Sequence, residues 1–493
     1  MSTFPLILMA LSSPDAFLSK DSNYLLNADL EALIDKLSER PLPLLKPDPV
    51  YPSLNGALLG GLLIAVVVLR PLWGVFILTA YLFELRSLVG VAFGLFFFAQ
   101  VFTIVSKWSV TKPGVHAGHP LTKLQYFVRE ALKPKVEYKP PLGYACGFFC
   151  TVFSFFLYRP NPVAYKRQWI AGSDGERFYV DWLLPSSGVI DSIAIVLHGL
   201  NGASDANYVV DVGKRLAQSN IAIACMVNRG MGDSYVTGEP SAWFSTTRTS
   251  DLNTVVETIE RLIEGYRTVK SKEDDTEVET PETRPTFPPA SLKERIPLYL
   301  IGFSNGGNIL ANFVGKMGST LENRIEACVC ISATLRAERS VRRVSSSIFQ
   351  GPMTWLLMKK LLPRVCAAAQ KAVLPEWLRF WCIPEIDRYI MYESHGFDEV
   401  DNYYKEFSIG SAGHFRNVAV PLLFIHAKDD PVFHIDDTAL EECITGNSFI
   451  TYLVTETGGH VGWPDALSIK GKWCFLSDVI QRYFSAVRHS CYS

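Results

Sequence analysis

One stretch of the chain places a serine between an apolar run and a helix-like segment. Residues 298–310 read LYLIGFSNGGNIL, which predicts a buried strand, a sharp turn with the pattern Gly-x-Ser-x-Gly, and a helix. A serine at such a turn has a strained backbone, so Gly302 and Gly306 are needed to let strand and helix approach. Ser304 is therefore a candidate nucleophile. Because a serine hydroxyl is a weak nucleophile, it needs a base and an orienting acid.

Six short apolar runs predict buried parallel strands, and helix-period segments such as 209–218 and 252–266 separate several of them. Strands that alternate with helices predict an α/β fold, a mostly parallel sheet covered by helices on both faces. The six runs are residues 193–197, 221–227, 298–301, 327–331, 422–426 and 450–454. Two interruptions are expected: a disordered charged insertion over 270–295 and a helical lid over 336–416.

The loops after the last two predicted strands supply an acid and a base. Asp429 and Asp430 follow one strand, and His460 follows the other in the order Ser, Asp, His that is typical of this turn. The carboxyl ends of parallel strands meet at one edge of the sheet, where ligand chemistry collects. Asp430 is preferred as the acid because, in related loops, the acid usually lies four positions after a strand-terminal histidine and directly before a proline, as Asp430 does with His426 and Pro431. Asp429 is retained as the alternative, with loop capping as its other role.

A loop after the first predicted strand could supply hydrogen-bond donors for an oxyanion. Residues 198–202 read HGLNG, and the backbone N–H groups of Leu200 and Asn305 are expected to point to one spot. Losing one such donor typically costs about 2.7 to 4 kcal/mol of barrier. His198 and His426 are interpreted as structural side chains that brace their loops.

Composition argues against several kinds of partner. The chain has 47 Lys and Arg against 49 Asp and Glu, a net charge of -2 that does not suggest nucleic acid. Ten cysteines are scattered, and the close pairs Cys146 with Cys150 and Cys328 with Cys330 have neither zinc-ligand nor redox spacing. No Cys/His cluster suggests a metal. We predict neither metal nor cofactor.

Residues 56–106 have the composition of a membrane anchor. Only three of the fifty residues from 56 to 105 are charged, and the stretches 56–83 and 87–105 each have the length of a span. Arg70 at mid-bilayer would cost about 2.5 to 3.5 kcal/mol, so it is expected near an interface. One span, two spans and a re-entrant hairpin all stay open, as does the orientation.

The segments around this anchor have different characters. Residues 1–55 form an N-terminal segment, and 107–142 are a basic, proline-punctuated juxtamembrane connector. The Phe-rich run 143–157 has only about 15 residues, too few for a span, so it is predicted to pack against the following domain or to lie at the lipid interface. The α/β domain is expected to occupy 143–487.

Taken together, these motifs resemble the α/β-hydrolase superfamily, and more narrowly its type-4 subfamily of YheT-like and embryogenesis-associated hydrolases, many of them membrane-anchored lipases and esterases. The resemblance implies that Ser304 is the nucleophile, His460 the general base and acid, and Asp430 the partner that holds the imidazole tautomer. It implies cleavage of carboxylic esters of lipids through an acyl-enzyme, as an acylglycerol lipase, phospholipase or carboxylesterase, without a cofactor. The motifs are HGLNG (198–202), NRGMG (228–232), GFSNGGN (302–308), DDP (429–431) and GGHVG (458–462).

Two alternative hypotheses stay open. His460 and Asp465 satisfy the pattern His-x4-Asp, which in some relatives accompanies acyl transfer to an alcohol or lysolipid. A catalytically silent membrane scaffold or binding protein is the other alternative, although all three residues of a triad are present. The expected partners are a lipid ester and a membrane, and the hydrolase domain is expected in the cytosol, with the endoplasmic reticulum a plausible organelle.

Overall fold

The computed structural model describes part of the chain. The predicted anchor over 56–106 lies outside the described residues, as do most of the predicted insertion over 270–295 and most of the predicted lid over 336–416. Within the described ranges, no helix is both long enough and apolar enough to cross a bilayer. The described residues are 25–26, 113–118, 121–132, 137–141, 147–156, 158–234, 242–274, 296–345, 387, 392, 395–437, 440–465 and 473–492.

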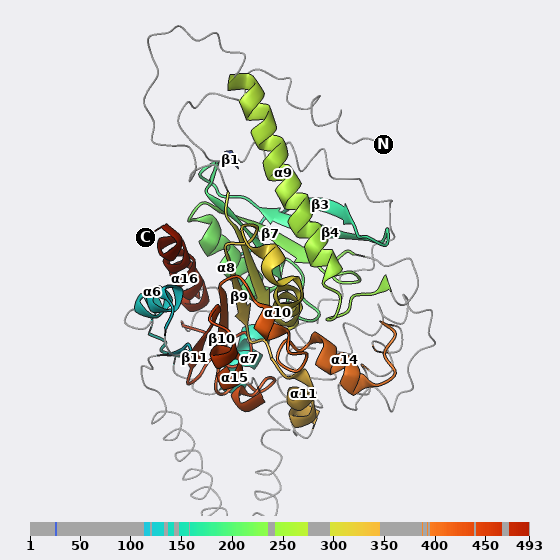
Figure 1. Ribbon diagram of the computed structural model, residues 1–493, viewed down its shortest axis with the longest axis vertical. Coiled ribbons are helices and arrows are strands. Elements are labelled where there is room, and N and C mark those ends of the chain that lie inside the picture. The colour runs from blue at the N-terminus through green and yellow to red at the C-terminus, as the bar shows by residue number, and fades with distance from the viewer. Residues whose placement is uncertain are drawn as a thin grey trace, which may run out of the picture.

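A nine-stranded sheet forms the centre of the structure (Figure 1). Its six central strands, from β7 to β11 in the sheet order, are parallel and coincide with the six predicted strands, which confirms the α/β architecture. The flanking strands β2, β4 and β3 are antiparallel and were not predicted. The sheet order is β2 (Gly114–His116), β11 (Ile450–Thr455), β10 (Leu422–Ala427), β9 (Ala327–Ile331), β8 (Leu298–Phe303), β6 (Ser192–Leu197), β7 (Ile221–Val227), β4 (Arg177–Leu183) and β3 (Lys166–Ala171).

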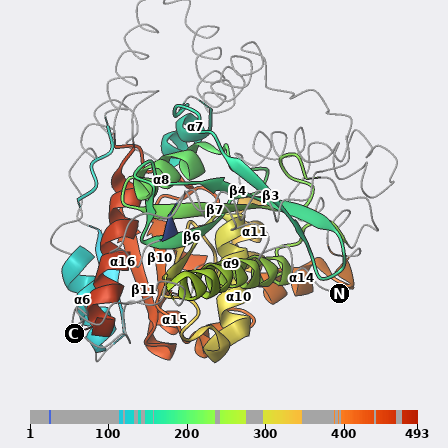
Figure 2. The same ribbon diagram turned by 90° about the horizontal axis from the view of Figure 1, so that it is seen from above.

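Helices cover both faces of this sheet (Figure 2). Successive side chains of a strand point to opposite faces, so Leu298 and Leu300 of β8 pack in one core while Tyr299 and Ile301 pack in the other. The first core includes α9 (Ser250–Asp274), α10 (Asn305–Met317) and α15 (Leu440–Gly446), and the second includes α6 (Lys123–Leu132), α8 (Asn207–Ala217) and α16 (Phe475–Tyr492).

The remaining elements are short or peripheral. Strand β1 (Leu25–Leu26) pairs antiparallel with β5 (Val189–Ile190). Helices α11 (Ala337–Ser345) and α14 (Val400–Phe407) belong to the predicted lid region, so its described parts include two helices. Helix α9 continues to Asp274 and so includes the first five residues of the predicted insertion.

Two elements correct the expectation of a connector over 107–142. Strand β2 pairs with the edge strand β11, and α6 packs on α16 with Val128 and Leu132 buried. Neither element was predicted from the sequence, because β2 has only three residues and α6 lies in a basic, proline-punctuated segment. Helix α7 (Gly147–Phe156) packs against the α/β domain, which is one of the two positions predicted for it: Cys150 is buried, and Asn207 of α8 donates to the Ser154 carbonyl at 3.1 Å.

Candidate active site

Ser304 lies at the turn between β8 and α10. Its backbone has φ 52° and ψ −118°, a left-handed conformation that non-glycine residues rarely adopt. A Cβ at Gly306 would come within 2.5 Å of the Leu197 and His198 carbonyl oxygens, and one at Gly302 within 2.5 Å of the Gly306 carbonyl oxygen. The predicted need for glycine at both positions is confirmed.

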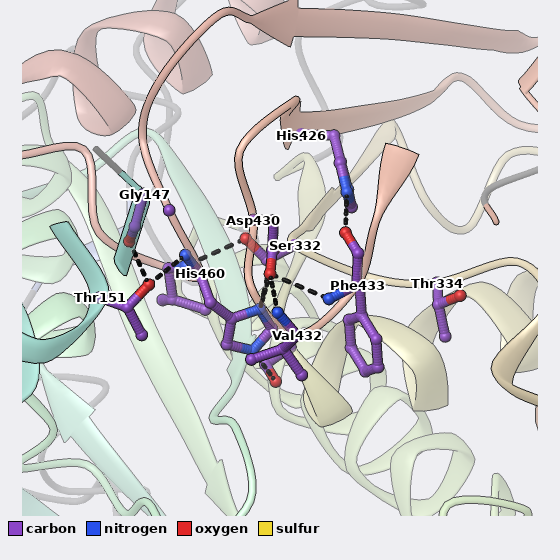
Figure 3. Close-up of polar contacts among 12 residues, drawn as sticks. Gly147, Thr151, Ser332, Thr334, His426, Asp430, Val432, Phe433 and His460 are labelled. Atoms are coloured by element: carbon purple, nitrogen blue, oxygen red, sulfur yellow. Dashed lines mark hydrogen bonds and ion pairs between the residues drawn. The ribbon is translucent and has the colours of Figure 1, made fainter. Parts of the chain in front are cut away.

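Ser304, His460 and Asp430 lie in one hydrogen-bonded chain. The Ser304 Oγ is 2.7 Å from His460 Nε2. On the other side of the ring, His460 Nδ1 is 2.9 Å from Asp430 Oδ2 and 3.2 Å from Oδ1 (Figure 3). Because a carboxylate only accepts hydrogen bonds, the Nδ1 atom carries the proton and Nε2 is free to accept the serine proton. The structure thus brings together the three residues that the sequence predicted.

Asp430 is fully buried yet favours its ionised form. Burial alone would raise its pKa, but the charge of His460 and the hydrogen bond from its ring, together with His426 and the Phe433 N–H, hold the pKa below its usual value. The backbone N–H groups of Val432 and Phe433 both donate to Oδ1, at 2.8 and 2.9 Å. These contacts fix the carboxylate so that Oδ2 faces His460.

Asp429 makes different contacts and does not replace Asp430. Its Oδ1 accepts the Gly459 N–H at 3.0 Å, in the loop that carries His460. Burial raises the pKa of Asp429 to about 6, and the neighbouring Asp430 charge adds to this effect, while backbone N–H groups oppose it. The preference for Asp430 as the partner of the imidazole, and the loop-capping role of Asp429, agree with these contacts.

The predicted oxyanion donors lie on neighbouring elements. Asn305 is the first residue of α10, and Leu200 lies in the loop after β6, which pairs with β8. A Cβ on Gly199 would be 3.2 Å from the Ser304 Cβ, so this loop passes directly beside the serine. The role of the Leu200 and Asn305 backbone N–H groups as oxyanion donors stays a prediction.

The two structural histidines are confirmed. His198 is fully buried, and its Nε2 accepts the Asn228 N–H at 3.1 Å while Nδ1 donates to the Gly199 carbonyl at 2.7 Å. Burial lowers the pKa of His198 to about 4, so the ring is neutral and braces the loop. His426 likewise donates from Nε2 to the Phe433 carbonyl at 2.6 Å.

Three residues near His460 had no predicted role. Thr151 Oγ1 accepts the His460 N–H at 2.8 Å, Ser332 Oγ accepts the Val461 N–H at 3.0 Å, and the Phe433 ring packs edge-on against the imidazole. Ser332 follows the buried strand β9 at the same sheet edge as the acid and the base, and that position was a usable indication. Thr151 lies in α7, before all the predicted strands, where no pattern indicated a role.

Asp465, the second member of the His-x4-Asp pattern, is used by a helix. Its Oδ2 accepts the N–H groups of Cys474 and Phe475 at 2.7 and 2.8 Å, where α16 begins. A carboxylate at a helix N-terminus satisfies unpaired N–H groups and interacts favourably with the helix dipole. These contacts account for Asp465 structurally.

An apolar, mostly aromatic cluster lies beside the serine. Leu200 packs against it, and the hydroxyl of Thr246, which neighbours the cluster in sequence, donates to the Asn305 side chain at 2.7 Å. The cluster contains residues of the loop after β7, of α11 and of α14. It therefore connects the surroundings of the Ser304 turn with the predicted lid region. Its buried members include Trp243, Phe244, Tyr392, Tyr403, Tyr404 and Phe407.

Comparison with known proteins agrees with the motifs and the fold. No family model matches the chain. Phospholipase ABHD3 of Homo sapiens is 22% identical over 350 residues, covering 68% of this chain and 74% of that protein. The putative esterase YheT of Escherichia coli K12 is 30% identical over 174 residues, covering 34% and 49%. The embryogenesis-associated protein EMB8 of Picea glauca is 22% identical over 328 residues, covering 64% of each. By these likenesses and its motifs, the chain is similar to the YheT-like group of the α/β-hydrolase superfamily.

Proposed function

We propose that this protein is a serine hydrolase that cleaves carboxylic esters of lipids with Ser304, His460 and Asp430. The observation that carries the proposal is the continuous hydrogen-bonded chain from Ser304 Oγ through the imidazole to a fully buried carboxylate, at 2.7 and 2.9 Å. The strained backbone of Ser304 supports it, because such strain collects at functional sites.

In the proposed mechanism, the His460 Nε2 takes the Ser304 proton as Oγ attacks the ester carbonyl carbon. The Leu200 and Asn305 N–H groups would stabilise the oxyanion, and the N-terminus of α10 adds a favourable dipole. His460 then gives the proton to the departing alcohol, which leaves an acyl-enzyme. Water, activated by the same Nε2, attacks the acyl carbonyl, and the acid product departs as the proton returns to Ser304 Oγ. Asp430 holds the tautomer and stabilises the imidazolium throughout.

The lipid character of the substrate is part of the proposal. The mostly aromatic cluster against which Leu200 packs is buried and makes the surroundings of the predicted oxyanion loop apolar, and the relatives include a phospholipase. We also propose that residues 56–106 anchor the chain in a membrane, because two stretches of span length in that region hold very few charges. An anchor of this kind would hold the site near a bilayer, where acyl chains are available.

Labelling of the full chain with a fluorophosphonate probe tests the enzyme proposal. The wild type should label and should hydrolyse at least one ester in a panel of phospholipids, monoacylglycerols and short-chain esters, while Ser304→Ala should do neither. A folded wild-type protein that stays unlabelled would instead support the scaffold hypothesis. Alkaline carbonate extraction tests the anchor, since release into the soluble fraction would contradict it.

Acyl transfer is the weaker alternative for this site. The structure uses Asp465 to hold the start of α16, so the His-x4-Asp pattern gives no support for a transferase. Adding a lysolipid or an alcohol to the same panel separates the two reactions, because a transferase would form a new ester at the expense of free fatty acid.

A further inference from the structure

Three successive backbone N–H groups in the loop that carries His460 are each bound by a side-chain oxygen from a different part of the fold. We call these three side chains the loop clamp. The pairs are Gly459 N–H with Asp429 Oδ1 at 3.0 Å, His460 N–H with Thr151 Oγ1 at 2.8 Å, and Val461 N–H with Ser332 Oγ at 3.0 Å.

The backbone of this loop adopts conformations that are unfavourable without support from other contacts. Gly459, Val461 and Trp463 have φ of 66°, 55° and 50°, and a left-handed conformation is especially unfavourable for a β-branched residue such as valine. Conformations of this kind persist only where surrounding contacts over-determine them. The loop clamp supplies such contacts at the base itself and on both sides of it.

Two of the three residues of the loop clamp are themselves held in place. Thr151 Oγ1 donates to the Gly147 carbonyl one turn earlier in α7, at 2.7 Å (Figure 3). Ser332 is fully buried, and its own N–H donates to the Ile425 carbonyl at 2.9 Å. The loop also lies directly on α7, since a Cβ at Gly459 would come within 2.2 Å of the Gly147 carbonyl oxygen.

We infer that the loop clamp positions His460 for catalysis and that Thr151, more than 300 residues earlier in the chain, is a positioning residue for the base. The inference rests on the proposed function. The clamp fixes the backbone direction from which the imidazole extends, and this keeps Nε2 at 2.7 Å from Ser304 Oγ while Nδ1 stays on Asp430. Small misplacements of a catalytic group reduce turnover strongly, even when substrate binding is unchanged.

Substitution of Thr151 tests the inference. Thr151→Val keeps the side-chain shape but removes the acceptor of the His460 N–H, whereas Thr151→Ser keeps the acceptor. Thr258→Val is the matched control, because Thr258 in α9 makes the same bond to the carbonyl one turn earlier, at 2.7 Å. The readouts are kcat and KM for the best ester of the panel, the rate of fluorophosphonate labelling and Tm.

We expect Thr151→Val to lower kcat and the labelling rate by about 10- to 100-fold with little change in KM. Thr151→Ser should recover most of the loss, and Thr258→Val should retain wild-type kcat. Ser332→Gly gives a second measurement that does not depend on the Thr151 variants folding. Glycine suits the φ of 49° at this position, so the variant should fold and still lose turnover.

Wild-type kcat in a folded Thr151→Val or, if that variant does not fold, in Ser332→Gly would overturn the inference. It would also be overturned if a folded Thr151→Ser were as impaired as Thr151→Val. In either case the wild type would still label and hydrolyse esters, so the proposed function would stand. If the folded wild type did neither, the proposed function would fail and this inference with it.

Discussion

Replacing Asp430 by asparagine should reverse the tautomer of His460. In the wild type, Oδ1 accepts the Val432 and Phe433 N–H groups, and Oδ2 faces His460 Nδ1 at 2.9 Å. An asparagine must keep its oxygen toward the two backbone donors, which places its NH₂ group against Nδ1. The ring then has to accept at Nδ1 and carry its proton on Nε2, where it can no longer receive the Ser304 proton.

The expected size of the effect follows from what a wrong tautomer costs in triads of this type. A wrong tautomer in a triad of this type lowers kcat by about 10⁴-fold. Each factor of ten corresponds to about 1.36 kcal/mol, so the loss is on the order of 5 kcal/mol of barrier. Because both oxygen positions keep a polar group, the fold should remain intact and KM should change little.

Asp429→Asn is the matched control, since it makes the same chemical change one residue away. An asparagine there keeps an oxygen for the Gly459 N–H, so kcat should fall by less than about tenfold, well short of the loss expected from a wrong tautomer. The assay is steady-state ester hydrolysis together with the fluorophosphonate labelling rate, and thermal unfolding verifies the fold. A loss of less than tenfold in Asp430→Asn, or an equal loss in the two variants, would refute the reasoning.

Three further predictions concern stability. Gly306→Ala should destabilise the fold by about 1 to 3 kcal/mol, because its Cβ would meet two carbonyl oxygens at 2.5 Å. Gly213→Ala in α8, whose Cβ would have its nearest contact at 3.5 Å, should instead stabilise the fold by up to about 1 kcal/mol. Urea unfolding of the two variants measures both effects. Asp429 has a raised pKa of about 6, so its protonated form favours folding, and stability from this group is lost as pH rises from about 4 through 6. Asp429→Asn should therefore gain stability relative to the wild type over that window, by up to about 3 kcal/mol, and equal pH profiles would contradict this. Asp465→Ala should cost about 0.5 to 2 kcal/mol at the start of α16 and leave the ratio of transfer to hydrolysis unchanged in the lysolipid assay.

The parallel core of the fold could be predicted because burial on both faces leaves a strong pattern. Runs such as 221–227 and 422–426 are almost wholly apolar, which is what a strand covered by helices on both sides requires. Two of the antiparallel strands, β2 and β3, were missed for the opposite reason. In β3, Lys166 and Arg167 are only partly buried, and β2 has three residues, so neither carries enough apolar sequence to indicate a strand.

The candidate site could be predicted for those side chains that come directly after a buried strand. Ser304, Asp430 and His460 each come within a few residues of a buried strand, and the shared sheet edge then brings them together. Thr151 could not be found in this way, because its contact with the His460 loop depends on how α7 packs against the finished sheet. The sequence indicated a helical lid over 336–416 but not where α11 and α14 begin and end, because these helices do not have to satisfy the hydrogen-bond ladder of the sheet.

The pairing of β2 with β11 has a consequence for the order of folding during synthesis. Strand β2 is the first strand of the large sheet to leave the ribosome, and its partner β11 is the last. Contacts between distant parts of a chain form slowly, and domains usually fold as units only when their segments are available. The N-terminal edge of this sheet therefore has to wait until almost the whole domain has been translated. We expect nascent chains that end before β11 to leave β2 unpaired, however complete the rest of the sheet has become.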